Sequence, residues 1–159
     1  MSDVIARLEQ GCTVNETFTE DELPGAQDRS FTYSTFDLKV TLRDDTDPPV
    51  TIAYVDELTG NQTIDFTVID RPVGDDLDAT GLKLQVFLLN NLSETTDVVI
   101  ADGAANPYSI NGGDDITVKP GARVLMYFND ELADVAAGVK EVDITAGVAE
   151  DYEILMLFG

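Results

Sequence analysis

Apolar and polar residues alternate with a period of two along most of the chain after Phe31. The first clear example, with polar residues between its members, is Phe36, Leu38, Val40 and Leu42. The same period returns in residues 50–54, 64–68 and 152–158. Because successive side chains of a strand point to opposite faces, this period predicts half-buried β-strands. About eight to ten short strands with almost no helix are typical of an all-β protein, here an antiparallel β-sandwich or jelly roll.

Turn residues indicate how the predicted strands connect. Gly60-Asn61 suits a tight hairpin turn, so the strands on either side of it are expected to pair antiparallel. Pro120-Gly121 fits the centre of a type II turn. The strand at 82–88 is apolar at most positions, which predicts a central strand covered on both faces. Residues 133–139 are expected to form one helical turn.

Residues 1–30 lack the period of two and are predicted to form an N-terminal arm outside a sandwich of residues 31–159. A short helix is expected over Ser2–Gln10, with Gly11 ending it. A helix of this length is not stable alone. The arm therefore needs a partner surface, and its candidate contacts are Val4, Ile5 and Leu8.

The last predicted strand, Tyr152–Phe158, is apolar on both faces. Leu155 and Leu157 lie on the face opposite Tyr152, Ile154, Met156 and Phe158. A monomeric sandwich covers only one face of such a strand. Another subunit is the simplest cover for Leu155 and Leu157, which predicts a cyclic homo-oligomer, with a trimer preferred. The alternative is that the arm of the same chain folds back over these two leucines.

Charge excludes several classes of partner. The chain has 31 Asp and Glu against nine Lys and Arg, for a net charge of −22 and a pI near 4.1. Such a surface repels phosphate backbones and anionic lipid headgroups, so neither nucleic-acid nor membrane binding is expected. The excess of Asp with few Lys resembles halophilic proteins, whose self-repulsion is screened by molar salt; the other interpretation is a β-protein with Asp-rich turns. No export signal or spanning segment is recognised, so synthesis as a soluble intracellular protein is expected.

Candidate chemistry is sparse. The chain has no His and a single Cys, Cys12, which excludes imidazole-based triads and paired-thiol metal sites. With no phosphate-binding or dinucleotide-binding motif either, we predict a protein that is not an enzyme and needs no cofactor. Carboxylates alternating in a loop can wrap Ca²⁺, although no segment matches the twelve-residue calcium loop and a solvated loop is the simpler explanation. The weak candidates are Asp44, Asp45, Asp47, Asp75, Asp76 and Asp78.

A series of short motifs resembles small virion structural proteins of tailed viruses. In that group a buried strand ends in paired Asn, an Asn-aromatic loop and a Pro-Gly turn follow, and a last strand ends in Gly. The corresponding segments are Gly81–Asn91, Ala104–Tyr108, Ile116–Ala122 and Tyr152–Gly159. The resemblance covers residues 31–159, with Phe31–Thr35 similar to the group's first strand. It implies a virion protein, made in the host cytoplasm and usually a symmetric oligomer, and the acidity fits a halophilic host.

The expected function is therefore mechanical. We expect a capsid decoration protein that binds the major capsid protein or other virion proteins and holds the head lattice against internal DNA pressure. One alternative is a tail, fibre or turret component that contacts the host surface through loops 44–49 and 106–115. Another is a cellular carbohydrate- or Ca²⁺-binding β-sandwich module, for which Tyr108 is the plausible sugar-stacking residue.

Overall fold

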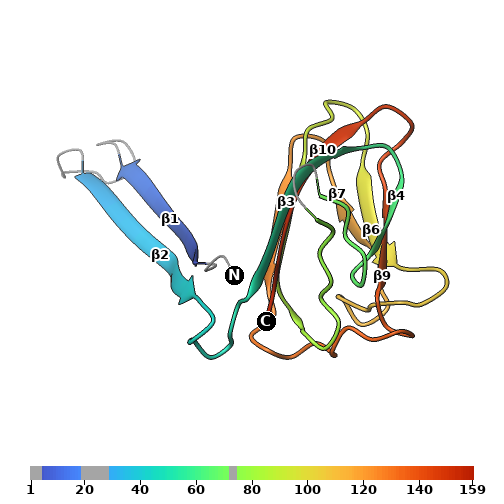
Figure 1. The fold of residues 1–159 in the computed structure, drawn as a ribbon. Helices are drawn as coiled ribbons and strands as arrows, with labels where there is room; N and C mark the ends of the chain where they lie inside the picture. The colour runs from blue at the N-terminus through green and yellow to red at the C-terminus, as the bar shows by residue number, and fades with distance from the viewer. Residues whose placement is uncertain (1–4, 19–28, 72–74) are drawn as a thin grey trace.

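The computed structural model describes residues 5–18, 29–71 and 75–159, which form ten β-strands and no helix (Figure 1). The prediction of an all-β sandwich is confirmed. None of the described residues belongs to a helix able to cross a membrane. In chain order the strands are β1 Ala6–Phe18, β2 Arg29–Leu42, β3 Ile52–Thr59, β4 Gln62–Asp65, β5 Leu84–Asn91, β6 Val98–Asp102, β7 Ile116–Val118, β8 Arg123–Tyr127, β9 Glu141–Thr145 and β10 Asp151–Phe158.

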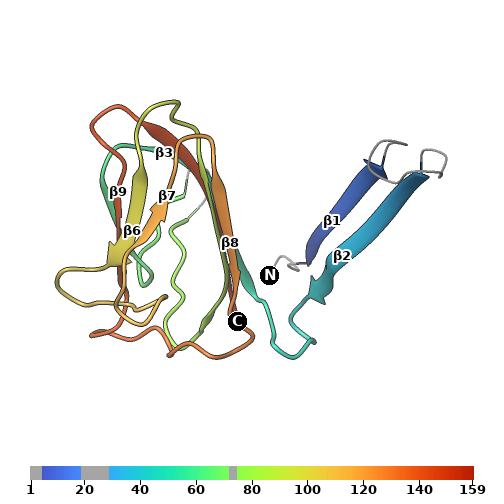
Figure 2. The same ribbon diagram turned by 180° about the vertical axis from the view of Figure 1, so that it is seen from behind.

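Two four-stranded antiparallel sheets pack face to face (Figure 1, Figure 2). The strand order is β3-β10-β5-β8 in one sheet, called sheet I below, and β4-β9-β6-β7 in the other, called sheet II. Strand β5 lies between β10 and β8 and is buried at six of its eight positions. This confirms the expectation of a central strand near residues 82–88.

The core between the sheets is centred on aromatic residues. Phe66 makes edge-to-face contacts with Tyr108 and Phe158, at ring-centroid distances of 5.0 and 5.1 Å. The Tyr108 hydroxyl donates to the carbonyl of Ala133 at 2.6 Å and accepts the N–H of Leu84 at 3.1 Å. Both its ring and its polar end are therefore used inside the fold. As expected from the sequence, one face of β10 completes this core with Tyr152, Ile154, Met156 and Phe158.

Strands β3 and β4 do not pair with each other, so the hairpin expected at Gly60-Asn61 is wrong. Strand β3 pairs with β10 and β4 pairs with β9, and the tight turn between them carries the chain from sheet I to sheet II. The Gly60 N–H donates to the Glu150 carbonyl at 3.0 Å, and Asn61 Oδ1 accepts the Ala146 N–H at 3.1 Å. Both strands have one apolar face, and crossing between layers lets both faces cover the same core.

The two other local expectations have opposite outcomes. The turn at Pro120-Gly121 is confirmed, with φ of 67° at Gly121 and the Ala122 N–H donating to the Lys119 carbonyl at 2.9 Å. The helical turn at 133–139 is wrong. Ala136 and Val139 instead exchange two backbone hydrogen bonds in an isolated bridge.

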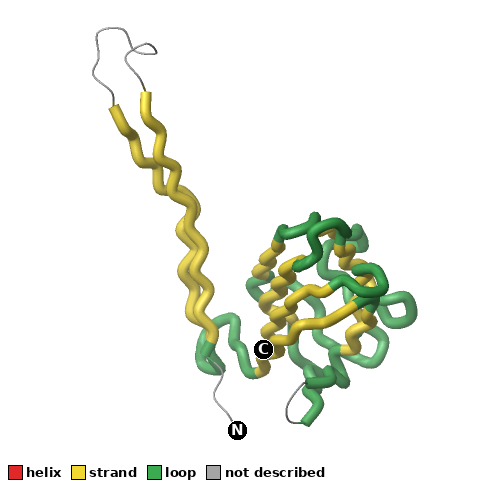
Figure 3. The backbone as a smooth tube through the Cα atoms, turned by 90° about the horizontal axis from the view of Figure 1, so that it is seen from above, coloured by secondary structure: helices red, strands yellow, loops and turns green. Residues whose placement is uncertain are grey.

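Strands β1 and β2 form a two-stranded antiparallel ribbon, which extends away from the sandwich in all views (Figure 1, Figure 2, Figure 3). The pairing runs from Ala6 opposite Leu42 to Phe18 opposite Arg29. The ribbon therefore includes residues 31–42, which the sequence analysis assigned to the sandwich.

The helix expected over Ser2–Gln10 is wrong for residues 6–10, which belong to β1. The apolar spacing of this segment fits a single helical turn as well as a strand. Pairing with β2 decides between them, because a long partner strand satisfies every second backbone group of β1, whereas an isolated turn of helix forms few hydrogen bonds.

Replacing Gly103 by Ala is expected to destabilise the sandwich by about 1–3 kcal/mol, the usual cost of overpacking. The Gly103 N–H donates to the Glu141 carbonyl, and a Cβ built on Gly103 would overlap the Glu141 Cβ and lie 2.6 Å from the Glu141 carbonyl oxygen. Urea unfolding at constant salt measures the loss. Gly138→Ala is the matched control, since nothing lies within 4 Å of a Cβ there. Equal midpoints for the two variants would contradict the expectation.

Candidate functional site

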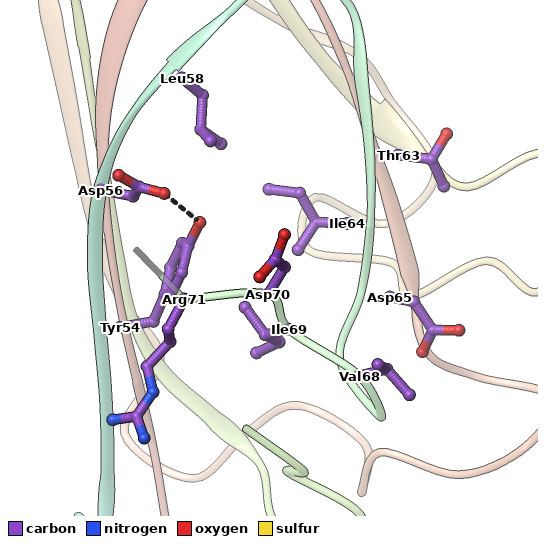
Figure 4. Close-up of a pocket in the computed structure, with 10 residues that line it drawn as sticks. All are labelled: Tyr54, Asp56, Leu58, Thr63, Ile64, Asp65, Val68, Ile69, Asp70 and Arg71. Carbon is purple, nitrogen blue, oxygen red and sulfur yellow. Dashed lines mark hydrogen bonds between the residues drawn. The ribbon is translucent and has the colours of Figure 1, made fainter. Parts of the chain in front are cut away.

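A cavity of 290 Å³ lies at the side of the sandwich where β3 faces β4 (Figure 4). Inside it, the Tyr54 hydroxyl donates to Asp56 Oδ2 at 3.1 Å, and Asp56 Oδ1 accepts the Glu57 N–H at 2.8 Å. Burial, with a contribution from Asp56, raises the pKa of Tyr54, so its phenol remains protonated. The cavity thus combines a protonated phenol with a hydrogen-bonded carboxylate.

Two charged residues at the rim of this cavity are held by other partners. Arg71 Nε donates to the Asp75 carbonyl at 2.9 Å, and Asp65 pairs with Lys140. Both side chains point away from the Tyr54 hydroxyl in Figure 4. Burial tends to raise the pKa of Asp65, but hydrogen bonds from Lys140 and Thr67 outweigh it and hold the pKa below its usual value. Both charged groups are therefore bonded within the chain.

The acidic loop residues named as weak metal candidates do not form a site. Asp45 pairs with Arg43, with 3.0 Å between Oδ1 and Nε, and Asp78 Oδ1 accepts the Thr80 N–H at 2.9 Å. Hydrogen bonds from Thr80 lower the pKa of Asp78. Across residues 5–18, 29–71 and 75–159, no group of three or more Asp, Glu or Cys side chains is arranged to hold a metal ion. Asp44, Asp47, Asp75 and Asp76 are solvent-exposed positions of the same two loops.

The outer face of sheet I, which faces the ribbon in Figure 1, carries residues aligned in three rows. The strand registers place one residue from each of the four strands in every row, and directly opposed residues share a face of the sheet. We call these rows the anchor row, the open row and the polar row. The anchor row is Ala53, Leu157, Val86 and Tyr127. The open row is Val55, Leu155, Leu88 and Leu125. The polar row is Glu57, Glu153, Asn90 and Arg123.

The base of the ribbon sits on the anchor row. Leu42 and Val50 are buried against Val86 and Leu157 in a hydrophobic cluster separate from the main core. Ala6 and Val40 of the ribbon pack against the edge of this cluster. Leu157, which is only 3% exposed, is thus covered by the chain's own N-terminal region. This cover comes mainly from Leu42 and Val50, which lie outside the arm of residues 1–30 that the sequence-based alternative proposed; from that arm, Ala6 packs against the cluster.

A compact turn joins the ribbon to β3. The Val50 N–H donates to the Arg43 carbonyl at 2.7 Å, and the Arg43 N–H donates to Thr46 Oγ1 at 2.8 Å. Leu42, just before the turn, and Val50, at its end, are both buried. Because both ends and the middle of the turn are held, the direction in which the ribbon leaves the sandwich is set.

The open row is not covered by the ribbon. Val55 is 63% exposed, while Leu88, Leu125 and Leu155 are half-buried. Two adjoining hollows of 370 and 410 Å³ follow this row, between the ribbon base and the polar row. Ile5, which is 70% exposed, lines the ribbon side. An apolar strip crossing a whole sheet is typical of a surface that is buried in the working assembly.

The predicted interface residues are therefore distributed over two surfaces. Leu157 is in the anchor row, and Leu155 is in the open row. Ile5 lines the hollow beside it. Leu8 lies in β1 opposite Val40, and Val4 falls outside the described residues.

Sequence reasoning missed three members of the open row, Val55, Leu88 and Leu125. For Val55 and Leu125 the signal was present as the unbroken apolar runs Ile52–Val55 and Val124–Phe128, each of which supplies both faces of an edge strand; Leu88 lies in the run Val86–Leu89 of the central strand. An edge strand that is apolar on both faces indicates a second partner layer as directly as β10 does. Only the strand order shows that these residues line up with Leu155.

The motifs behind the resemblance to tailed-virus proteins have structural roles here. Asn91, at the end of β5, is buried and donates to the carbonyls of Thr96 and Val118 at 2.9 and 3.0 Å. The Asn106 N–H and side-chain amide donate to the Glu141 carboxylate at 3.1 and 3.0 Å. The Asn91 bond to Val118 joins β5 of sheet I to β7 of sheet II, and the Asn106 bonds hold the β6–β7 loop on β9; the resemblance stays a prediction. No family model, curated protein or solved structure matches this chain.

Proposed function

We propose that this protein is a non-catalytic structural component of a virus particle, a decoration protein bound to the head of a tailed virus. The observation that carries the proposal is the ribbon, whose base is anchored on sheet I while its two strands, among the residues that the structure describes, pair with each other and with no third strand. An isolated two-stranded hairpin is marginally stable in water, and its outer edges offer unpaired backbone groups. A ribbon built in this way gains stability by docking on another chain.

The proposed mechanism gives the sandwich and the ribbon different tasks. The sandwich is the rigid body, with a complete aromatic core. The end of the ribbon away from its base docks on the major capsid protein or another virion protein, and the area buried there holds neighbouring subunits together. Homo-oligomers, with a trimer preferred, would occupy symmetric positions of the lattice. A net charge of −22 suits an outer position, since the body has no attraction to the packaged nucleic acid.

The assignment to a virion rests on the tailed-virus resemblance of residues 31–159. Two observations weigh against the other candidate functions. Tyr108, the residue named for sugar stacking, is 1% exposed and bonded at both ends within the core, so its ring is not accessible to a carbohydrate. Part of the loop proposed to contact a host surface is also occupied, because Asn106 is bonded to Glu141.

Quantitative mass spectrometry of virus particles purified from the source culture tests the proposal. A decoration protein is expected in hundreds of copies per particle, because it follows the symmetry of the head lattice. The major capsid protein in the same sample is the internal standard. A handful or a few dozen copies would indicate a tail or fibre component. Absence from particles while the protein is present in the infected cells would contradict a virion role.

A further inference from the structure

We propose that the ribbon of one copy of this chain covers the open row of a second copy, so that copies exchange ribbons. This inference goes beyond the proposed function and does not depend on a virus particle. It starts from two incomplete surfaces on one molecule. The open row is an apolar strip on which Val55 remains 63% exposed, although Ile5–Arg7 line one side of the hollow beside it; among the described residues, β1 and β2 pair with each other and pack on their own sandwich at the ribbon base.

A copy cannot cover its own open row with its own ribbon. Leu42 and Val50 hold the ribbon base on the anchor row, immediately beside the open row. The hydrogen bonds of the turn from Arg43 to Val50 then direct the strands away from sheet I, as Figure 1 and Figure 2 show. Laying the ribbon flat on Val55 would require breaking this turn or lifting Leu42 out of its buried site.

The intrachain contact shows what kind of surface the sheet accepts. On the anchor row, the covering groups are Ala6, Val40 and Leu42, from paired positions of β1 and β2. On each of the four strands, the open-row residue lies two positions from the anchor-row residue and therefore on the same face of the sheet. A second ribbon lying next to the first would therefore extend an existing interface of the same chemistry.

The dimensions are compatible with this arrangement. At about 3.4 Å per residue, the 13 and 14 residues of β1 and β2 extend over about 45 Å, whereas an eight-residue body strand spans about 27 Å. Anchor row and polar row are four residues apart along β10, or about 14 Å. This gap accommodates a ribbon two strands wide, crossing the body strands at a steep angle as in orthogonal sheet packing.

Charge favours the ribbon over any other part of a second copy. Residues 43–159 carry 23 acidic and six basic residues, a net charge of −17. Strands β1 and β2 carry three acidic and three basic residues, Glu9, Glu16, Asp37, Arg7, Arg29 and Lys39, and are neutral, while the ten residues that connect them carry four acidic residues and no basic one. Two sandwich bodies repel each other at close range, whereas the paired strands of a ribbon approach an acidic body without this penalty.

A single ribbon contact on one row is small compared with a standard interface of about 800 Å² per partner. Exchange removes this weakness, because every copy then donates one ribbon and receives one. Reciprocal donation closes a dimer, and head-to-tail donation closes a ring such as the preferred trimer. Either assembly is expected to be closed and to depend on protein concentration and on salt.

Light scattering on the full-length protein at about 2 M KCl, over a range of concentrations, is the first test. The wild type is expected to form a dimer or a small ring, and Val55→Asp is expected to be monomeric with an unchanged circular dichroism spectrum. Val148→Asp is the matched control, since Val148 is 96% exposed and lies in the β9–β10 loop, seven residues before Leu155 of the open row. A monomeric wild type, or an unchanged assembly of Val55→Asp, would overturn the proposal.

Cross-linking identifies which surfaces meet. Cys12 of β1 is the one cysteine of the chain, so Val55→Cys places a second thiol on the open row. A bis-maleimide is expected to join the two thiols between copies, which raises the mass on a denaturing gel, whereas a link within one copy does not. The product should disappear in Cys12→Ser/Val55→Cys and be weak in Val148→Cys. A product that persists in the Cys12→Ser variant would mean that open rows face each other, and lack of any product in the associated protein would also refute exchange.

Discussion

The melting temperature of this protein at pH 7 is expected to rise by at least roughly 4–8 °C between about 0.1 M and 2 M KCl, which corresponds to about 2 kcal/mol for a domain of this size. The cause is self-repulsion. The net charge of −22 is spread over a single small chain, and molar salt shortens the screening length from about 10 Å to about 3 Å. Salt also weakens exposed ion pairs such as Lys119–Asp97, but these contribute little.

Three controls separate screening from other effects of salt. At a pH near the pI of about 4.1, the net charge vanishes and the increase with KCl should shrink. A rise with sulfate alone would indicate exclusion from the protein surface instead. Association also raises a melting temperature, so the measurement is repeated with Val55→Asp at low concentration. A melting temperature that is flat or falls with KCl would contradict the halophilic interpretation.

The two outer-face leucines of β10 are expected to respond very differently to truncation. Leu157→Ala should lower the free energy of unfolding by about 2–5 kcal/mol, because Leu157 is enclosed by Leu42, Val50 and Val86 and its loss leaves a cavity. Leu155→Ala should cost less than about 1 kcal/mol in a monomer, since its half-buried side chain already borders an open hollow. Denaturant unfolding at fixed salt measures both, and each is the control for the other.

Hydrogen exchange adds a second measurement to this pair. Truncating Leu157 removes a packing contact of the ribbon base. Amide hydrogen exchange at Val40 to Leu42 is therefore expected to be faster in Leu157→Ala than in Leu155→Ala. Light scattering is expected to show the reverse selectivity, with weaker association in Leu155→Ala. Equal destabilisation by the two substitutions would mean that the open row is as enclosed as the anchor row.

Several features of the fold followed from local sequence alone. Alternation in residues 152–158 predicted both faces of β10, and the nearly continuous apolar run at 82–88 predicted a central strand. Pro120-Gly121 predicted its own turn type. In each case the side chains in a short window carry the information, because period and turn geometry are local properties of the backbone.

Pairing of distant segments was not available from the same reasoning. Gly60-Asn61 are residues typical of a hairpin turn. The turn nevertheless joins two sheets, because β3 pairs with β10 and β4 pairs with β9. Residues 6–10 have helical spacing, yet β2 provides a strand partner across a connection of ten residues. A local pattern states which faces are apolar and leaves open which neighbour covers them.

By itself the sequence determined that this protein is an acidic all-β chain with an N-terminal arm and with more apolar strand faces than one core can use. Period, turn residues and net charge are all readable without knowing any contact. The tertiary structure alone decided that Leu157 lies beneath the ribbon while Leu155 lies in a row with Val55, Leu88 and Leu125. The physical reason is that a surface across four strands arises from strand order and register, which bring together residues from four separate segments of the chain.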